Sequence, residues 1–324
     1  GPLGAGVKSK AESELSLLKA AKIRLEGHDA GQKIFPWDRS FYTSLVKDKI
    51  SGDEQSLLHE HFHLNACLDG LRIIMSSLFG IDMQQCDVST HEIWSDDVTK
   101  MELRHETEGV LGYIYFDLFP RPGKYNHAAH FTIRGGRMPG AGMEYQKPVV
   151  ALVCNFSRQW GSSVAVLSHG EFETLLHEFG HAVHSVLART KFHNLCGTRG
   201  AVDFVEIPSH LFEHFAWDHR VLKRFAKHAS THNTLPAEDL ESMRKRRQSF
   251  AAMDIQQQIM LSAMDLEFHT LSPTSDWTEV FAQVQRRYTC VSPGSQVPWQ
   301  TTFGHVVGYG AGYYRYLGDC TGAP

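Results

Sequence analysis

Apolar side chains recur every three or four residues over most of this sequence, which is the spacing that buries one face of an α-helix. Pro36 and Pro208 each stand near the start of such a stretch, where the first helical turn tolerates a proline. Gly80 follows another stretch and is a typical C-terminal stop. The pattern predicts helices over residues 8–24, 36–46, 65–79, 172–187, 208–229, 236–250, 251–269 and 278–288.

Between Val98 and Phe156 the apolar period changes to alternation, with many Val, Ile, Tyr and Phe residues. The chain is therefore predicted to be mainly α-helical with a small β-sheet of three or four strands. Residues 127–134 are the candidate edge strand, where a further extended segment would add by β-augmentation; an ordinary paired strand is the alternative. We expect strands over residues 98–106, 109–119, 128–134 and 149–156, and an irregular segment over residues 81–91.

Composition narrows the class of protein. The chain has 324 residues, of which 42% are hydrophobic and 21% charged, and these values are ordinary for a soluble globular protein. Its formal net charge is −4, so no basic field favours nucleic acid, and no apolar run is long enough for a transmembrane helix. The six cysteines are scattered without a C-x-x-C pair, so we expect them to be reduced, with Cys67 and Cys154 in the core.

The strongest chemical signal is the sequence HEFGH at residues 177–181, an H-E-x-x-H match inside a predicted helix. Positions four apart return to nearly the same helix face, so His177 and His181 can direct both imidazoles at one metal ion. Two imidazoles suit Zn²⁺, and a catalytic site adds a third protein ligand and a position open to water. Glu178 would then be the general base that takes a proton from that water.

A third ligand must come from downstream, where the acidic candidates are Asp203, Glu206, Glu213 and Asp218. Glu206 opens the sequence E-I-P-S, at or just before the start of a predicted helix. If that helix start crosses behind the first helix, it presents the Glu206 carboxylate to the metal. Gly180 is a poor helix former in mid-helix, which indicates that another segment approaches the backbone closely there.

A second H-E-x-x-H match, at residues 59–63, lies in a polar run that precedes the helix predicted over residues 65–79. No E-x-P-S sequence follows shortly after it, so we interpret this copy as the approach to that helix. For the match at residues 177–181, the alternative is a pair of buried histidines with a packing role only.

Residues 303–316 form the last informative stretch, in which glycines alternate with phenols and an imidazole. This composition is typical of a mobile loop that presents hydrogen-bond donors. Attack of an activated water on a carbonyl group places negative charge on the former carbonyl oxygen, which a positioned phenol O–H or imidazole N–H stabilises. Tyr309, Tyr313 and Tyr316 fit that role; the alternative is that some of them only pack a following helix.

Several of these segments carry a resemblance to a known family. HEFGHAVHS, GTR and DFVEIPS resemble the thimet oligopeptidase family of zinc metallopeptidases. HEIWSDDV, RHETEGVLGYIYFDLFPRPGKYNHAAHFTIRGG and FGHVVGYGAGYYRYL are similar to its mitochondrial intermediate peptidase branch. The resemblance extends from about Phe35 to Leu317, and a P-W-D sequence at residues 36–38 gives Trp37 a packing role.

The resemblance implies a zincin-like catalytic domain of an oligopeptidase that holds one Zn²⁺ per chain. The family's third ligand is the glutamate of its E-x-P-S sequence, which maps onto Glu206. The family's glycine-rich loop contacts substrate and the tetrahedral intermediate. Its donors map onto His305, Tyr309, Tyr313 and Tyr316, with Tyr309 and Tyr316 the first candidates.

The resemblance also implies an endopeptidase that removes a short N-terminal peptide from imported precursor proteins in the mitochondrial matrix. The alternatives are a general oligopeptidase that degrades free peptides and a catalytically incompetent peptide-binding fragment. The expected partner is a peptide or an unfolded precursor, with no nucleic acid and no membrane insertion, and the chain is expected to be a monomer. Family members are longer, so residues 8–324 are expected to be one catalytic region of a two-lobed protein, preceded at residues 1–7 by a tag remnant and linker.

Overall fold

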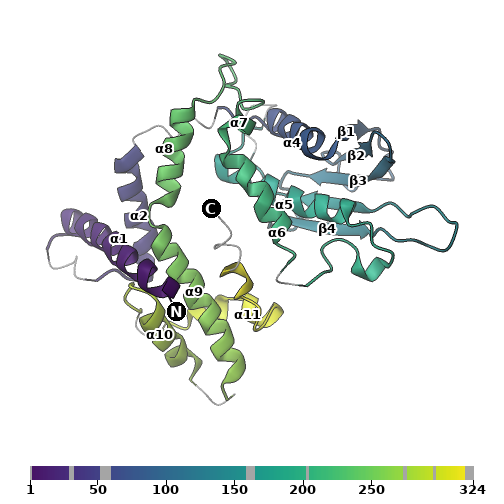
Figure 1. The fold of residues 1–324 in the computed structure, drawn as a ribbon. Helices are drawn as coiled ribbons and strands as arrows, with labels where there is room; N and C mark the ends of the chain where they lie inside the picture. The colour runs from purple at the N-terminus through teal and green to yellow at the C-terminus, as the bar shows by residue number, and fades with distance from the viewer. Residues whose placement is uncertain are drawn as a thin grey trace. The chain divides into compact units, whose positions relative to one another are not determined.

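The computed structural model describes residues 2–28, 33–51, 60–157, 165–201, 204–272, 276–294 and 297–317. The chain divides into two compact units (Figure 1). We call Gly1–Asp53 together with Glu241–Pro324 the terminal unit, and Glu54–Leu240 the central unit. Each unit has its own packing and is described by itself.

The terminal unit is helical. Its long helices are α1 (Pro2–Glu26), α2 (Pro36–Ser51), α9 (Ala251–Thr270) and α10 (Trp277–Tyr288), and its short ones are η5 (Trp299–Thr302) and α11 (His305–Gly308). α8 (Ala237–Gln248) begins in the central unit and ends in the terminal one. α9 packs against both α1 and α10, so the two ends of the chain share one core. The helices predicted over residues 8–24, 36–46, 251–269 and 278–288 are confirmed, and α1 includes most of the expected leading linker.

A buried carboxylate joins α1 to the start of α9. Glu14 accepts hydrogen bonds from the backbone N–H groups of Ala252 (3.3 Å) and Met253 (2.9 Å). These groups belong to the first helical turn, which has no intrahelical acceptors. Phe250 precedes them with a φ of 69°, a left-handed conformation that separates α8 from α9. Glu14 therefore satisfies a helix end that is buried in the core.

The central unit contains a five-stranded sheet in the order β1-β2-β3-β5-β4. Neighbouring strands are antiparallel except for β3 and β5, which are parallel. Four strands predicted from alternation are confirmed, and β4 lies at the end of the order, as expected of the candidate edge strand. The strands are β1 (Ile81–Cys86), β2 (Thr99–His105), β3 (Gly109–Asp117), β4 (Ala129–Arg134) and β5 (Val149–Val153).

The prediction of an irregular segment over residues 81–91 is wrong at its start, where β1 forms. Ile81 and Met83 are buried, whereas Asp82 and Gln84 are exposed. Antiparallel pairing with β2 stabilises this short polar strand. Because this stabilisation comes from another strand, the sequence of β1 alone does not predict it.

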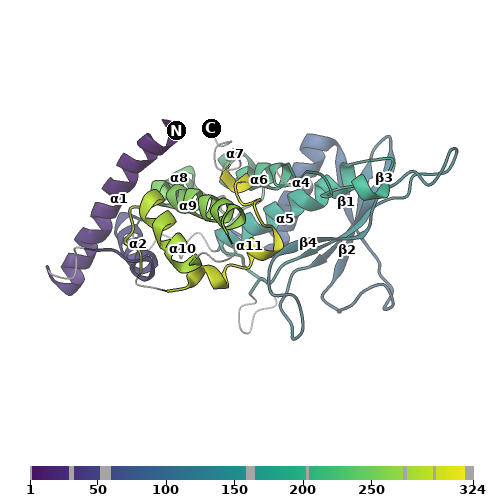
Figure 2. The same cartoon turned by 90° about the horizontal axis from the view of Figure 1, so that it is seen from below.

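Two helices, α4 (Leu64–Phe79) and α5 (His169–Leu187), lie on one face of the sheet (Figure 2). The strand register places Met83, Leu103 and Phe116 on that face, and the Phe116 ring stacks on Phe179 of α5. The start of α5 is set by a capping box between Ser168 and Glu171. The helix predicted over residues 65–79 is confirmed as α4, with Gly80 in the left-handed C-cap conformation.

The single helix predicted over residues 208–229 is wrong, because this part of the chain is broken into short pieces. They are α6 (Ile207–Glu213), η4 (His214–Trp217) and α7 (His219–Leu222). Asp218 is extended, and its side chain accepts a hydrogen bond from the Arg220 N–H. This N-cap begins a new helix where the apolar pattern alone suggests continuation.

The cysteine predictions agree with the structure where it describes them. Cys67, Cys86, Cys154, Cys196 and Cys290 are free, and Cys67 and Cys154 are buried as expected. Within the described ranges, no helix combines the length and apolarity needed to cross a membrane.

Candidate metal centre

The frame of the candidate site is the close crossing of α5 and α6. A Cβ atom on Gly180 would lie 2.6 Å from the Cα of Ser209 and 2.7 Å from the carbonyl oxygen of Pro208. Only glycine permits this backbone approach, as its mid-helix position predicted. The crossing brings Glu206, the N-cap residue of α6, against the histidines of α5.

Three predicted ligands converge at this crossing. The Oε2 atom of Glu206 lies 3.2 Å from the Nε2 atom of His181 and 3.6 Å from the Nε2 atom of His177. A tetrahedral zinc ion with bonds of about 2.0–2.1 Å separates its ligand atoms by about 3.3 Å. The spacing of these donor atoms therefore fits one shared metal ion, and the chemistry of the set, two imidazoles and a carboxylate, suits zinc.

The protonation state of Glu206 also suits a ligand. Its burial alone would raise the pKa, but the hydrogen bond with His181 and the proximity of His177 outweigh burial and hold the pKa at about 2. The group is therefore a carboxylate at neutral pH. Ser209 donates its hydroxyl to the backbone carbonyl of Glu206 at 2.7 Å, which fixes the position of the residue.

Glu213 and His210 form an outer layer that the sequence did not assign. The Oε1 atom of Glu213 lies 2.6 Å from Nδ1 of His177 and 3.1 Å from Nδ1 of His210. His177, His210 and Glu213 could also be read as metal donors, since their atoms lie within 4.8 Å of one another. The 2.6 Å separation is a hydrogen-bond distance, shorter than two ligands of one zinc ion require.

The Glu213 carboxylate contacts the Nδ1 side of the His177 ring, and the Nε2 side of the same ring faces Glu206 at 3.6 Å. A carboxylate on the far nitrogen of a ligating histidine is the usual way to fix its tautomer and orientation. Glu213 was a candidate third ligand, and its place seven residues after Glu206, two helical turns on, is the signal for a role on the same face. Of the other two candidates, Asp218 pairs with Arg220, and Asp203 lies outside the described residues.

Glu178, the candidate base, is buried on α5 beside the two histidines. Burial raises its pKa, His177 and His181 lower it, and a hydrogen bond from the backbone of His130 lowers it further; the net direction is upward. A carboxyl group with a raised pKa is suited to accept a proton and to return it later in the same reaction.

The edge strand β4 reaches the same place through His130, which the sequence did not single out. The rings of His130 and His181 are 6.3 Å apart. Burial lowers the pKa of His130 to about 3, and the proximity of His181 and His184 adds to the effect. His130 is therefore a neutral imidazole at the end of the sheet, next to a candidate ligand.

The four candidate donors of the glycine-rich stretch gather in the terminal unit. The His305 ring lies 5.2 Å from the ring of Tyr309, 4.7 Å from that of Tyr313 and 5.7 Å from that of Tyr316. Asp265 accepts the backbone N–H of Tyr313 at 2.9 Å, which fixes the turn on α9. Tyr309 is exposed, whereas Tyr313 and Tyr316 form hydrogen bonds with Gln258 and Arg315. The structure brings these residues together with one another, and their role in hydrolysis stays a prediction.

The second H-E-x-x-H match is consistent with its interpretation as the approach to a helix. Its first histidine, His59, lies outside the described residues. Glu60 pairs with His228 at 2.7 Å, and His63 is the N-cap residue of α4. Among the described residues, the groups that could hold a metal lie only around His177.

The sequence model of peptidase family M3 matches residues 3–319, across both units. The chain therefore belongs to peptidase family M3. Within it, the chain is 41% identical to the mitochondrial intermediate peptidase of Arabidopsis thaliana over 313 residues, which are 96% of this chain and 44% of the relative.

The same comparison gives 37% identity to the mitochondrial intermediate peptidase of Homo sapiens, over 94% of this chain and 42% of the relative. The Neurospora crassa enzyme of that name is 36% identical, over 98% of this chain and 45% of the relative. The chain thus spans less than half the length of these relatives.

Proposed function

We propose that this chain is the zinc-binding catalytic region of a metalloendopeptidase with a zincin-like fold. The observation that carries the proposal is the convergence of His177, His181 and Glu206 at the spacing of zinc ligands, with the Glu178 carboxyl group beside them. These three side chains would hold one Zn²⁺ per chain. Bound zinc would supply Lewis-acid activation of water and of the scissile carbonyl group.

The protein's own residues supply the proton transfers. Glu178 takes a proton from the attacking water and then delivers it to the nitrogen of the leaving amine. Its raised pKa supports both steps, because the protonated form is easier to reach than for an exposed glutamate. Glu213 holds His177 in one orientation during the reaction.

Two further elements are assigned to the substrate. The edge of β4 binds the substrate backbone as an added strand, supported by its place at the end of the sheet. His305, Tyr309 and Tyr316 are assigned as donors to the oxyanion, and Tyr313 as a substrate contact. Their clustering around one imidazole supports a shared role.

We further propose that the whole protein removes a short N-terminal peptide from imported precursors in the mitochondrial matrix. The names of the relatives and the identity over nearly all of this chain support this assignment. General degradation of free peptides is the alternative. A panel of precursors and unrelated peptides separates the two, because processing predicts cleavage at a fixed distance from the precursor's N-terminus.

The metal assignment is tested by zinc content per chain, measured by elemental analysis. We expect about one zinc in the wild type and in Glu178→Gln, and much less in Glu206→Ala, because only the last change removes a ligand. Hydrolysis of a peptide should be lost in Glu178→Gln despite its zinc. Near-normal turnover in Glu178→Gln would reject the base. Bound zinc without turnover in the wild type would favour a peptide-binding fragment.

A further inference from the structure

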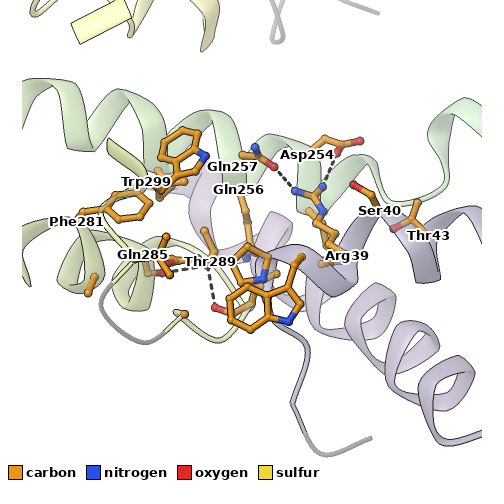
Figure 3. A pocket seen from close by; sticks show the side chains of 18 of the residues that line it. Arg39, Ser40, Thr43, Asp254, Gln256, Gln257, Phe281, Gln285, Thr289 and Trp299 are labelled. Atoms are coloured by element: carbon orange, nitrogen blue, oxygen red, sulfur yellow. Dashed lines mark hydrogen bonds and ion pairs between the residues drawn. The ribbon is translucent and has the colours of Figure 1, made fainter. Parts of the chain in front are cut away.

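The terminal unit contains a cavity that the candidate metal centre does not use. It lies among α2, α9 and α10 and has a volume of about 740 Å³ (Figure 3). Binding sites for small molecules and cofactors typically have volumes of about 300–1,000 Å³. All of its lining residues belong to the terminal unit, so the cavity is defined independently of the central unit.

Two indole rings form apolar walls of this cavity. Trp299 stacks on Phe281 at 5.4 Å and is 37% exposed. Trp37 stacks on Phe35 at 4.9 Å, in keeping with its expected packing role, yet it is 61% exposed. Gly294 makes room for it, since a Cβ there would lie 2.8 Å from the indole. Rigid, partly exposed aromatic faces suit an apolar side chain of a ligand.

The charges that line the cavity do not balance. Arg39 is bonded to Gln257 and Asp254 (Figure 3), and Asp254 is the one acidic side chain among the described residues of the lining. Lys47 also lines the cavity, and no described residue forms an ion pair with it. Burial lowers the pKa of Lys47, although Asp254 opposes this. Among the described lining residues there are thus two cationic side chains and one carboxylate, and the Glu14 carboxylate that also acts on Lys47 lies outside the lining. An anionic group of a ligand would be stabilised beside Lys47 on the cavity side.

Neutral hydrogen-bonding groups also line the cavity. The Oε1 atom of Gln256 accepts the backbone N–H of Cys290 at 3.1 Å, which holds the Gln256 amide in place along the lining. Gln285, Ser40 and Thr43 also line the cavity, and Thr43 Oγ1 has no hydrogen-bond partner among the described residues. Amides and hydroxyls are the groups that bind the backbone of a peptide.

We propose that this cavity binds the C-terminal end of a short peptide, with the carboxylate at Lys47 and an apolar last side chain between Trp37 and Trp299. The site requires a free carboxylate, an apolar residue and at least one amide bond. It is distinct from hydrolysis and does not depend on a bound metal.

The test measures binding of two probes to the Glu178→Gln protein, in which peptide cleavage is not expected. The probes are N-acetyl-Ala-Ala-Phe with a free carboxylate and the same peptide as its C-terminal amide. Calorimetry should show saturable binding of the acid, with the amide about tenfold weaker, as expected for loss of one charge contact. N-acetyl-phenylalanine is the third probe and should bind more weakly than the tripeptide acid.

Substitutions of lining residues test whether the probes bind in this cavity. Lys47→Gln should remove the preference for the acid, and Lys49→Gln, an exposed change on the same helix, should leave it unchanged. Trp299→Ala should weaken both probes. Ser40 is exposed and lines the cavity, so Ser40→Phe should fill the cavity and weaken binding of both probes. This variant replaces Trp299→Ala if the latter does not fold.

Absence of saturable binding, or equal affinity for acid and amide, would overturn the proposal. Unchanged binding in Lys47→Gln and Ser40→Phe would also do so. N-acetyl-phenylalanine binding as tightly as the tripeptide would overturn the assignment to a peptide. Failure here leaves the zinc content of the central unit unaffected, so the two proposals are tested separately.

Discussion

Glu213 contacts two histidines at the candidate metal centre, of which His177 is a proposed ligand. Its carboxylate lies between His177 and His210, and burial, which would raise its pKa, is outweighed by these two partners, so the pKa is held at about 2. The side chain is therefore a permanent acceptor at neutral pH. A carboxylate on the far nitrogen of a ligating histidine is the usual way to orient its ring, and Glu213 is placed to do so for His177.

Glu213→Gln keeps the shape of the side chain and removes its charge. We expect zinc affinity to fall about 10- to 100-fold, the range typical for loss of such an outer partner. Competition with a fluorescent zinc chelator measures this. Glu102→Gln, an acid-to-amide change on β2 of the same unit, is the control. Equal zinc affinity in Glu213→Gln and the control would mean that Glu213 does not orient His177.

At the scale of an element, Asp117 is the last residue of β3 and the centre of a cluster of hydrogen bonds and ion pairs that stabilises the end of this strand. Its buried carboxylate accepts two hydrogen bonds from Arg121 (2.7 and 2.8 Å) and one from Trp94 (2.8 Å), and Lys124 lies 2.9 Å away. Lys124 also donates to the backbone carbonyl of Cys154, just after β5. The cluster therefore joins the ends of two parallel strands.

The same cluster makes stability depend on pH. Burial would raise the pKa of Asp117, but Arg121, Trp94 and Lys124 lower it from 3.8 to about 2. A depressed folded-state pKa contributes stability above the unfolded-state pKa, and that stability is lost as pH falls from about 4 to about 2. The contribution at pH 7 is about 2 kcal/mol.

Asp117→Asn should therefore be less stable than the wild type by about 2 kcal/mol or more at pH 7, with the difference shrinking as pH falls toward 2. Urea unfolding at several pH values measures this. Asp69→Asn, which removes an exposed surface pair with Arg72, should change stability by less than about 1 kcal/mol. A difference for Asp117→Asn that stays constant with pH would rule out the ionised carboxylate as its source.

The elements that could be predicted from the sequence are those whose formation depends on residues close together in the chain. The i, i+4 spacing of His177 and His181, the helical period around them and the demand for a close approach at Gly180 all lie within one helix. β1 was missed because its stability comes from pairing with β2. The break in the predicted helix over residues 208–229 depends on the conformation of one side chain, Asp218.

In the candidate site too, residues with a nearby sequence motif were predicted, and residues brought in by tertiary packing were not. Glu206 was predicted from its place before Pro208 and from the family resemblance, and it lies beside both histidines. The contributions of His130 and His210 depend on how β4 and α6 pack against α5. That packing joins residues up to about fifty positions apart, which spacing along the chain does not reveal.

At the scale of the whole molecule, the candidate metal ligands found among the described residues all belong to the central unit. A bound metal therefore stabilises that unit first, by an amount that grows with metal concentration, about 2.7 kcal/mol at 100 times the dissociation constant. Chelation should increase amide hydrogen exchange in α5 and α6 and leave α1 and α9 nearly unchanged. Hydrogen exchange with mass spectrometry, with and without a chelator, measures this.

Equal increases in all four helices would show that the two units unfold as one body. No change in α5 and α6 would show that the central unit holds no metal under those conditions. The Glu206→Ala protein is the control, because chelation should have little effect on it.

The terminal unit is built from two separated parts of the chain, Gly1–Asp53 and Glu241–Pro324. During synthesis, α1 and α2 are made before the central unit, and α9, against which α1 packs, follows only after it. At about 5–20 residues per second, this interval is roughly 10–40 seconds. The central unit therefore has time to fold before α9 is made and completes the core that it shares with α1.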